Sequence, residues 1–262
     1  MSQKGRLAAR VMAASKAAKI AKVSRLGIIA SALLTFMIFS ISYYGQKVGN
    51  FTFTLDRLAL ESGMTLYDDA EQKEYKTRII ADQVSEADGM TEYCGKFDDD
   101  GNLLTPFPIG DSVCIPNDEI LGSVDGPNNG ENYLAYTFYL EHVGSRPVDL
   151  ATNIKLVSAS KGAEEAVRIR VIINDAGTTY AKAQSSNSDE PGEPEPLTTP
   201  FLGITTVMES TFYKYMPGDI TKITIILWYE GEDSNHNIGI HSGGVKFEMN
   251  FTVTRIYQDR DL

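Results

Sequence analysis

The stretch VKFEMNFTVT, residues 245–254, is the strongest indication of fold in this sequence. Five apolar side chains, from Val245 to Val253, alternate with Lys246, Glu248 and three uncharged polar residues. Successive side chains of a strand point to opposite faces, so this alternation predicts a strand with one buried and one wet face.

The same period of two recurs along the chain, at residues 51–55, 134–140 and 167–173. Shorter strand candidates lie at 77–84, 149–157, 180–183, 201–208 and 212–216, separated by clusters of Gly, Pro, Asn and Asp. The run KITIILWY at 222–229 is apolar on both faces, which is typical of a central strand covered on each side. Trp228, the only tryptophan, is therefore expected in the core.

Helical patterns are nearly absent after Tyr44. Eight to ten strands without alternating helices favour an antiparallel, jelly-roll-like β-sandwich over a parallel α/β sheet. Residues 45–262 are expected to form this one domain, with loop insertions at 85–131 and 184–199. The second insertion is rich in Pro and acidic residues and is predicted to be mobile.

The N-terminal region has a different composition. Residues 1–25 carry seven basic and no acidic residues, which leaves 17 of the 24 basic and all 35 acidic residues for the rest, a net charge of −18. Residues 26–44 contain no charge over 19 positions, about enough for a helix to cross a bilayer core of about 30 Å. Basic residues resist translocation, so we expect 1–25 in the cytoplasm and the domain outside the cell.

The fate of the apolar helix is open between two alternatives. The long basic tail and long apolar run favour a retained single-pass anchor in the cell membrane. Ser40 and Ser42 form a small-x-small pattern that would allow cleavage before Tyr43 and secretion of the domain. The basic tail itself is either solvated or an Ala-rich helix lying on anionic lipid.

The two cysteines, Cys94 and Cys114, both fall in the expected extracellular part. An oxidising environment lets a disulfide persist there, so a bridge is the favoured state and two independent thiols the alternative.

Motifs that would carry chemistry are weak. Asp98–Asn102 forms an acidic turn, but the twelfth position of a calcium loop starting at Asp98 is Ile109 and not glutamate, which favours a solvated turn. A second acidic patch, Glu230, Glu232 and Asp233, lies near His236 and His241 and is interpreted as an ordinary polar loop.

Catalytic and nucleic-acid-binding motifs are missing as well. His142, His236 and His241 could act as bases, yet there is no G-x-S-x-G turn and no H-E-x-x-H helix. We therefore predict no catalytic, metal or cofactor site. The charge of −18 argues against nucleic-acid binding.

Several segments resemble the TasA and camelysin group of secreted or membrane-anchored proteins of Gram-positive firmicutes, in an uncharacterised branch. They are SYYGQKVGNFTFTLD, NYLAYTFYLEHVG, VRIRVIIND with TTYAKA, and ITIILWYEGEDSNHNIGIHSGGVKFEMNFTVTR. The resemblance implies a jelly-roll-like sandwich and, in some members, biofilm matrix fibres built by donating an N-terminal strand to the next subunit. Phe51, Phe53 and Leu55 would lie on that strand here.

The expected function is that of a non-enzymatic surface protein of the cell envelope, structural, adhesive or self-assembling. Its expected partners are the bilayer, through residues 26–44, and other copies of the chain, through strand edges. A calcium- or carbohydrate-binding surface module is the alternative, and a surface metalloprotease is a third and weaker one. The sequence names no small-molecule ligand.

Overall fold

The computed structural model describes residues 51–84, 87–94, 113–184, 192–235 and 243–258, all within one compact unit, Lys47–Leu262. The basic tail, the predicted membrane helix at 26–44, the turn at 98–102, His236 and His241 lie outside the described residues. Within the described ranges, no helix is both long and apolar enough to span a bilayer.

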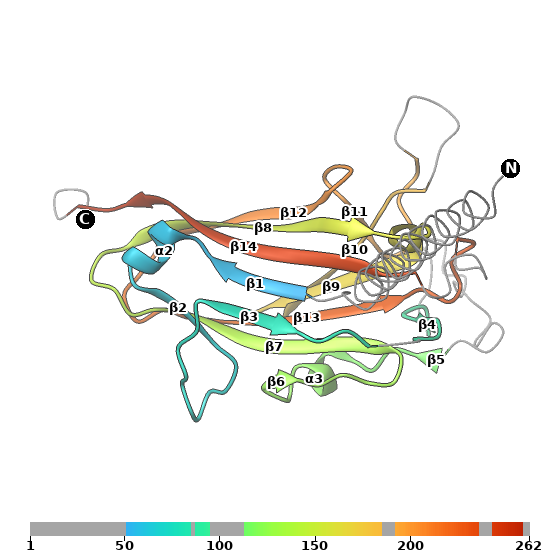
Figure 1. Ribbon diagram of the computed structural model, residues 1–262, viewed down its shortest axis with the longest axis horizontal. Coiled ribbons are helices and arrows are strands. Elements are labelled where there is room, and N and C mark those ends of the chain that lie inside the picture. Colours follow the sequence, from blue (N-terminus) through green and yellow to red (C-terminus); the bar gives the residue numbers. More distant parts are fainter. Residues whose placement is uncertain (1–50, 85–86, 95–112, 185–191, 236–242, 259–262) are drawn as a thin grey trace, which may run out of the picture. The chain divides into compact units, whose positions relative to one another are not determined.

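The described part is mainly β, as predicted, and its strands form two large sheets (Figure 1). The first sheet has the order β12-β8-β14-β1-β3. Its strands are β12 (Thr206–Tyr215), β8 (Val148–Ala159), β14 (Val245–Ile256), β1 (Phe51–Leu55) and β3 (Arg78–Ala81).

The second sheet has the order β11-β10-β9-β13-β7-β2, with β6 paired to β7. Its strands are β11 (Thr199–Pro200), β10 (Ala176–Ala181), β9 (Val167–Ile173), β13 (Ile220–Tyr229), β7 (Tyr133–His142), β2 (Met64–Tyr67) and β6 (Gly126–Pro127). A small third sheet joins β4 (Met90–Thr91) to β5 (Val113–Cys114). The described residues also form three short helices, α2 (Arg57–Glu61), α3 (Asp118–Leu121) and α4 (Ala163–Ala166).

The two large sheets share one hydrophobic core, consistent with a β-sandwich. The Phe53 ring on β1 lies 4.2 Å from the Phe138 ring on β7, and Phe138 meets Phe251 of β14 at 6.3 Å. The five apolar side chains between Val245 and Val253 are all buried, which confirms the alternation in the stretch that indicates the fold.

β13 is covered on both faces, as its sequence predicts. Ile223 and Ile225 face the shared core, whereas Ile226 and Trp228 face a second cluster that includes Met90 and Leu121. Those two residues come from β4 and α3, within the predicted insertion at 85–131. Part of that segment is therefore a lid over the outer face of the second sheet, closed by the predicted disulfide between Cys94 and Cys114.

Two details differ from the sequence prediction. The candidates at 201–208 and 212–216 were wrong in their bounds: residues 201–205 are not in a strand, and β12 runs without a break from Thr206 to Tyr215. The polar centre of β12 is tolerated because it lies on an outermost strand with an exposed face. The pairing is also not antiparallel throughout: β1 runs parallel to β14, with Phe51 opposite Phe247 and Leu55 opposite Phe251. β1 ends at Leu55, and the next residue, Asp56, caps α2 by accepting the Ala59 N–H at 2.7 Å.

Candidate functional site

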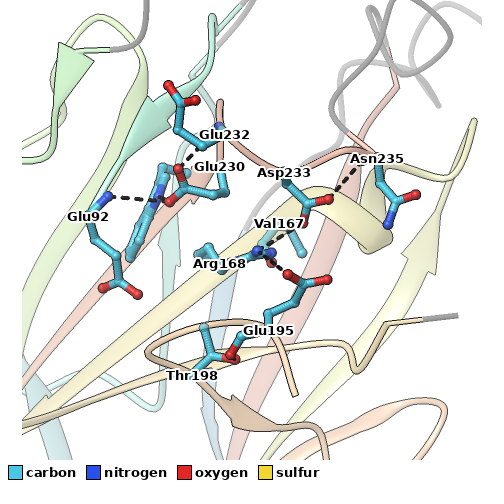
Figure 2. Close-up of polar contacts among 10 residues, drawn as sticks. Glu92, Val167, Arg168, Glu195, Thr198, Glu230, Glu232, Asp233 and Asn235 are labelled. Carbon is cyan, nitrogen blue, oxygen red and sulfur yellow. Dashed lines mark hydrogen bonds and ion pairs between the residues drawn. The ribbon is translucent and has the colours of Figure 1, made fainter. Parts of the chain in front are cut away.

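A buried arginine, Arg168 at the start of β9, lies at the centre of the most concentrated group of buried charges. Its Nη2 lies 2.8 Å from Oδ2 of Asp233 and 3.4 Å from Oε2 of Glu195, and its Nη1 donates to the Val167 carbonyl at 3.4 Å. Figure 2 shows the guanidinium between the two carboxylates. A buried charge needs such partners, so Arg168 ties the turn after β13 and the segment before β11 to β9.

Two carboxylates thus share one guanidinium. Burial, and then the charge of Asp233, raise the pKa of Glu195, while Arg168 offsets part of this shift. One negative charge is therefore in excess at this point, and Glu195 is the carboxyl that the surroundings favour for protonation.

Glu230 is fully buried directly after β13. Its Oε2 accepts the Trp228 indole N–H and the Glu92 backbone N–H, each at 3.3 Å, and its Oε1 accepts the Glu232 backbone N–H at 3.3 Å. Burial raises the pKa of Glu230. The Glu230 side chain therefore joins the residue after β4, Glu92, to the end of β13, and Figure 2 shows this contact.

Glu92 begins a chain of contacts along the outer face of the second sheet. Its Oε2 accepts the Thr179 hydroxyl at 2.9 Å, Thr179 accepts Arg170 Nη1 at 2.9 Å, and Arg170 makes two 2.7 Å bonds to Asp118. The other oxygen, Oε1, is shielded from solvent without a hydrogen-bond partner among the described residues. Burial raises the pKa of Glu92 to about 7. We call Glu92, Arg168, Glu195, Glu230 and Asp233 the Arg168 cluster.

Two open clefts flank α3 beside this chain of contacts. One, of about 440 Å³, is lined by Glu92, Asp118 and Arg170 together with apolar residues near the disulfide. The other, of about 580 Å³, is lined by Asp118, Asp175 and Lys222 among others. Both clefts combine carboxylates with one cation, an arrangement able to hydrogen-bond a hydroxyl-rich molecule.

The described residues contain no group of three His, Cys, Asp or Glu side chains arranged to hold a metal ion. The Arg168 Nη2 already has two carboxylate partners, whereas its buried Nε has no hydrogen-bond partner among the described residues. The chemistry of the cluster is that of a structural clamp, with Glu92 as a carboxyl that can change its charge near neutral pH.

The acidic patch at 230–233 differs from its interpretation as a polar loop, because Glu230 and Asp233 are buried and hydrogen-bonded. Sequence reasoning missed Arg168, since strand alternation in VRIRVII places arginines on a face that looks solvent-exposed. Two features of the sequence could have indicated the cluster. Arg168 and Arg170 lie on one face of an otherwise apolar strand, and the acidic segment 230–233 directly follows the most apolar strand, so the two could have been expected to pair. Glu195 lies in the predicted mobile insertion, yet only 8% of it is exposed.

His142, a candidate base in the sequence, is a structural residue in the fold. It is fully buried, its Nε2 lies 2.7 Å from the Arg146 carbonyl oxygen, and its Nδ1 is 3.1 Å from the Gly144 N–H. The first contact requires Nε2–H and the second an unprotonated Nδ1, so both ring nitrogens are occupied in a neutral imidazole. The side chains of Phe51, Phe53 and Leu55 are buried within their own domain.

Comparison with known proteins does not identify a family. No family model matches the sequence, and no curated protein does. Two crystal structures of a β-glucosidase from Kluyveromyces marxianus are similar in part, one with glucose (11% identity, TM-score 0.24) and one labelled with selenomethionine (10%, 0.23). Each alignment covers 76% of this chain and 17% of the enzyme, and the scores are too low to indicate a shared fold, activity or substrate.

Proposed function

We propose that this chain is a single-pass protein of the cell envelope, related to the TasA and camelysin group, whose acidic β domain is displayed outside the cell. The domain makes structural, adhesive or self-assembling contacts and is not an enzyme. The observation that carries the proposal is the position of β1.

β1 begins seven residues after the end of the predicted membrane helix at Tyr44. Phe51 and Phe53 are 2% and 0% exposed, and the strand is hydrogen-bonded to β14 on one side and β3 on the other. The strand that begins seven residues after the predicted helix is thus part of the core of the domain, which supports the proposal of a short tether and a domain held close to the bilayer.

Self-assembly by strand donation would use the same strand. In this chain β1 occupies a place in its own sheet, parallel to β14. A neighbour's 51–55 segment would have to replace it there, satisfying the same backbone donors and acceptors. The two-sheet architecture supports the β-sandwich that the resemblance implies.

The proposal is tested by intact mass and membrane fractionation of the chain from its native envelope. A full-length species in the membrane fraction supports anchored display, and a soluble species beginning near Tyr43 supports secretion and strand donation. The variant Ser42→Arg, which removes the small side chain that a signal peptidase accepts, should abolish only the soluble species. Specific hydrolytic activity of the pure chain would contradict the non-enzymatic role.

The clefts beside α3 favour one second candidate, a carbohydrate-binding surface module. Calcium binding is the other form of this alternative, and the described residues contain no group of three acidic or histidine side chains that would carry it. Calorimetric titration of the full chain with calcium chloride, and separately with oligosaccharides, measures either ligand directly. Asp118→Asn should reduce such binding, whereas Glu209→Gln on the exposed face of β12 should not. The absence of heat with both ligand classes would remove this candidate.

A further inference from the structure

An uncharged, exposed tip projects from the acidic domain. Residues 196–208, PLTTPFLGITTVM, contain no charged side chain. Within them Leu202 is 65% exposed and Ile204 is 84% exposed, although both are large and apolar. We call Leu202, Gly203 and Ile204 the 202–204 tip.

The tip has a defined conformation. The Leu202 N–H donates to the Val207 carbonyl at 3.3 Å, and the Gly203 N–H donates to the Thr206 carbonyl at 3.0 Å. A Cβ added at Gly203 would meet no atom within 4 Å. The turn is therefore held by its own backbone, and its apolar side chains extend into open space.

The register of the first sheet places this tip level with the beginning of the domain. The Leu156 N–H of β8 donates to the Thr205 carbonyl at 2.8 Å. Leu156 is paired with Phe247 of β14, and Phe247 with Phe51 of β1. Thr205, Leu156, Phe247 and Phe51 thus form one row across the sheet, and Figure 1 shows β1 and β14 running side by side away from it.

The chain that precedes Phe51 sets how far this row can lie from the membrane. Only residues 45–50 separate Phe51 from the predicted helix, and six residues span at most about 20 Å. The row itself crosses three strand spacings, about 14 Å in total. A membrane helix ending at Tyr44 would therefore keep the tip within reach of the bilayer surface.

We propose that the 202–204 tip docks on the outer surface of the phospholipid bilayer and sets the orientation of the domain. This inference rests on the proposed membrane anchor. The tip suits a lipid surface because its two apolar side chains can enter the interface and because no carboxylate of residues 196–208 is repelled by anionic headgroups. The anchor supplies a high effective concentration, so a contact of two side chains suffices.

Bromine quenching of tryptophan fluorescence tests the proposal with the full chain. The chain is reconstituted in phosphatidylcholine vesicles with ordinary or brominated acyl chains. Ile204→Trp places a second tryptophan at the tip, while the native Trp228 is 1% exposed and contributes the same background to every variant. Tyr213→Trp is the matched control, since Tyr213 is 78% exposed on β12 but about 30 Å further along the chain.

The proposal expects the emission added by Ile204→Trp to be blue-shifted and quenched by brominated lipid, and that added by Tyr213→Trp to be neither. Equal behaviour of the two variants would overturn it. A blue shift at position 204 without bromine quenching would also overturn it. That result would mean that the tip is covered by protein, such as a second copy of the chain, and not by lipid. Vesicle flotation separates this failure from failure of the anchor: a chain that does not float with the vesicles refutes both proposals.

Discussion

The substitution Glu92→Gln should stabilise the domain above neutral pH and leave it almost unchanged in acid. Burial raises the pKa of Glu92 to about 7 from an ordinary value of 4.5, and its Oε1 lacks a hydrogen-bond partner among the described residues. Because the pKa is higher in the folded chain, the stability linked to this carboxyl is complete below pH 4.5 and is lost as the pH rises through 7. The full loss amounts to about 3 kcal/mol.

Glutamine resembles the protonated carboxyl and cannot ionise. The free energy of unfolding of Glu92→Gln should therefore match that of the native sequence near pH 4.5 and exceed it by about 2–3 kcal/mol near pH 8.5. The measurement is urea unfolding of the full chain in a non-ionic detergent, followed by the fluorescence of Trp228, which is buried and bonded to Glu230. Comparison at each pH removes the contributions of Glu195 and Glu230, whose pKa values are also raised.

Glu119→Gln is the control, because Glu119 lines the same cleft as Glu92 but is exposed. It removes the same formal charge and should change the free energy of unfolding by less than about 0.5 kcal/mol at either pH. The difference in free energy of unfolding between Glu92→Gln and the native sequence could instead stay constant from pH 4.5 to 8.5. Burial would then not raise the pKa of Glu92, and the reasoning would be refuted.

Three further substitutions should be read out by the same unfolding measurement. Arg168→Met should cost about 3–5 kcal/mol near pH 8 by leaving Asp233 and Glu195 without their cation, and a loss that does not diminish in acid would contradict this cause. Phe53→Ala should cost about 3–5 kcal/mol because its ring packs between the sheets, whereas Thr54→Ala on the partly exposed face should cost less than about 1 kcal/mol. Cys94→Ser combined with Cys114→Ser should cost about 3 kcal/mol, since the bridge closes a separation of 20 residues; an unchanged urea midpoint would show that the lid is held by packing alone.

The strands could be predicted where one face is buried and the other is wet. β14 keeps its alternation from Val245 to Val253 because it lies between β8 and β1, with only one face on the core, and loses it where the register shifts between Val253 and Arg255. β13 could be recognised as central because both of its faces are covered. β12 was divided in two, since an outermost strand can carry polar residues that resemble a turn.

The Arg168 cluster could not be predicted because its members are brought together by long-range packing. Arg168 and Asp233 are 65 residues apart, and Glu92 lies 138 residues from Glu230. Each charged residue alone indicates a solvated position. That face of the sheet is removed from water by the lid that includes β4 and α3, and Arg168 itself also lies against the segment of Glu195 and the turn of Asp233. Alternation reports which side chains share a face and not whether a distant segment covers it.

The position of β1 also limits how strand donation could occur. Withdrawing the strand exposes Phe51, Phe53 and Leu55, which are nearly fully buried, and this costs roughly 5–9 kcal/mol at about 1.5–3 kcal/mol for each side chain. That cost is comparable to the total stability of a domain, about 5–15 kcal/mol. A folded chain would therefore open its own β1 rarely, and a neighbour's strand would have to enter before folding is complete. Fibre assembly by this route depends on the order of export and folding, whereas anchored display does not.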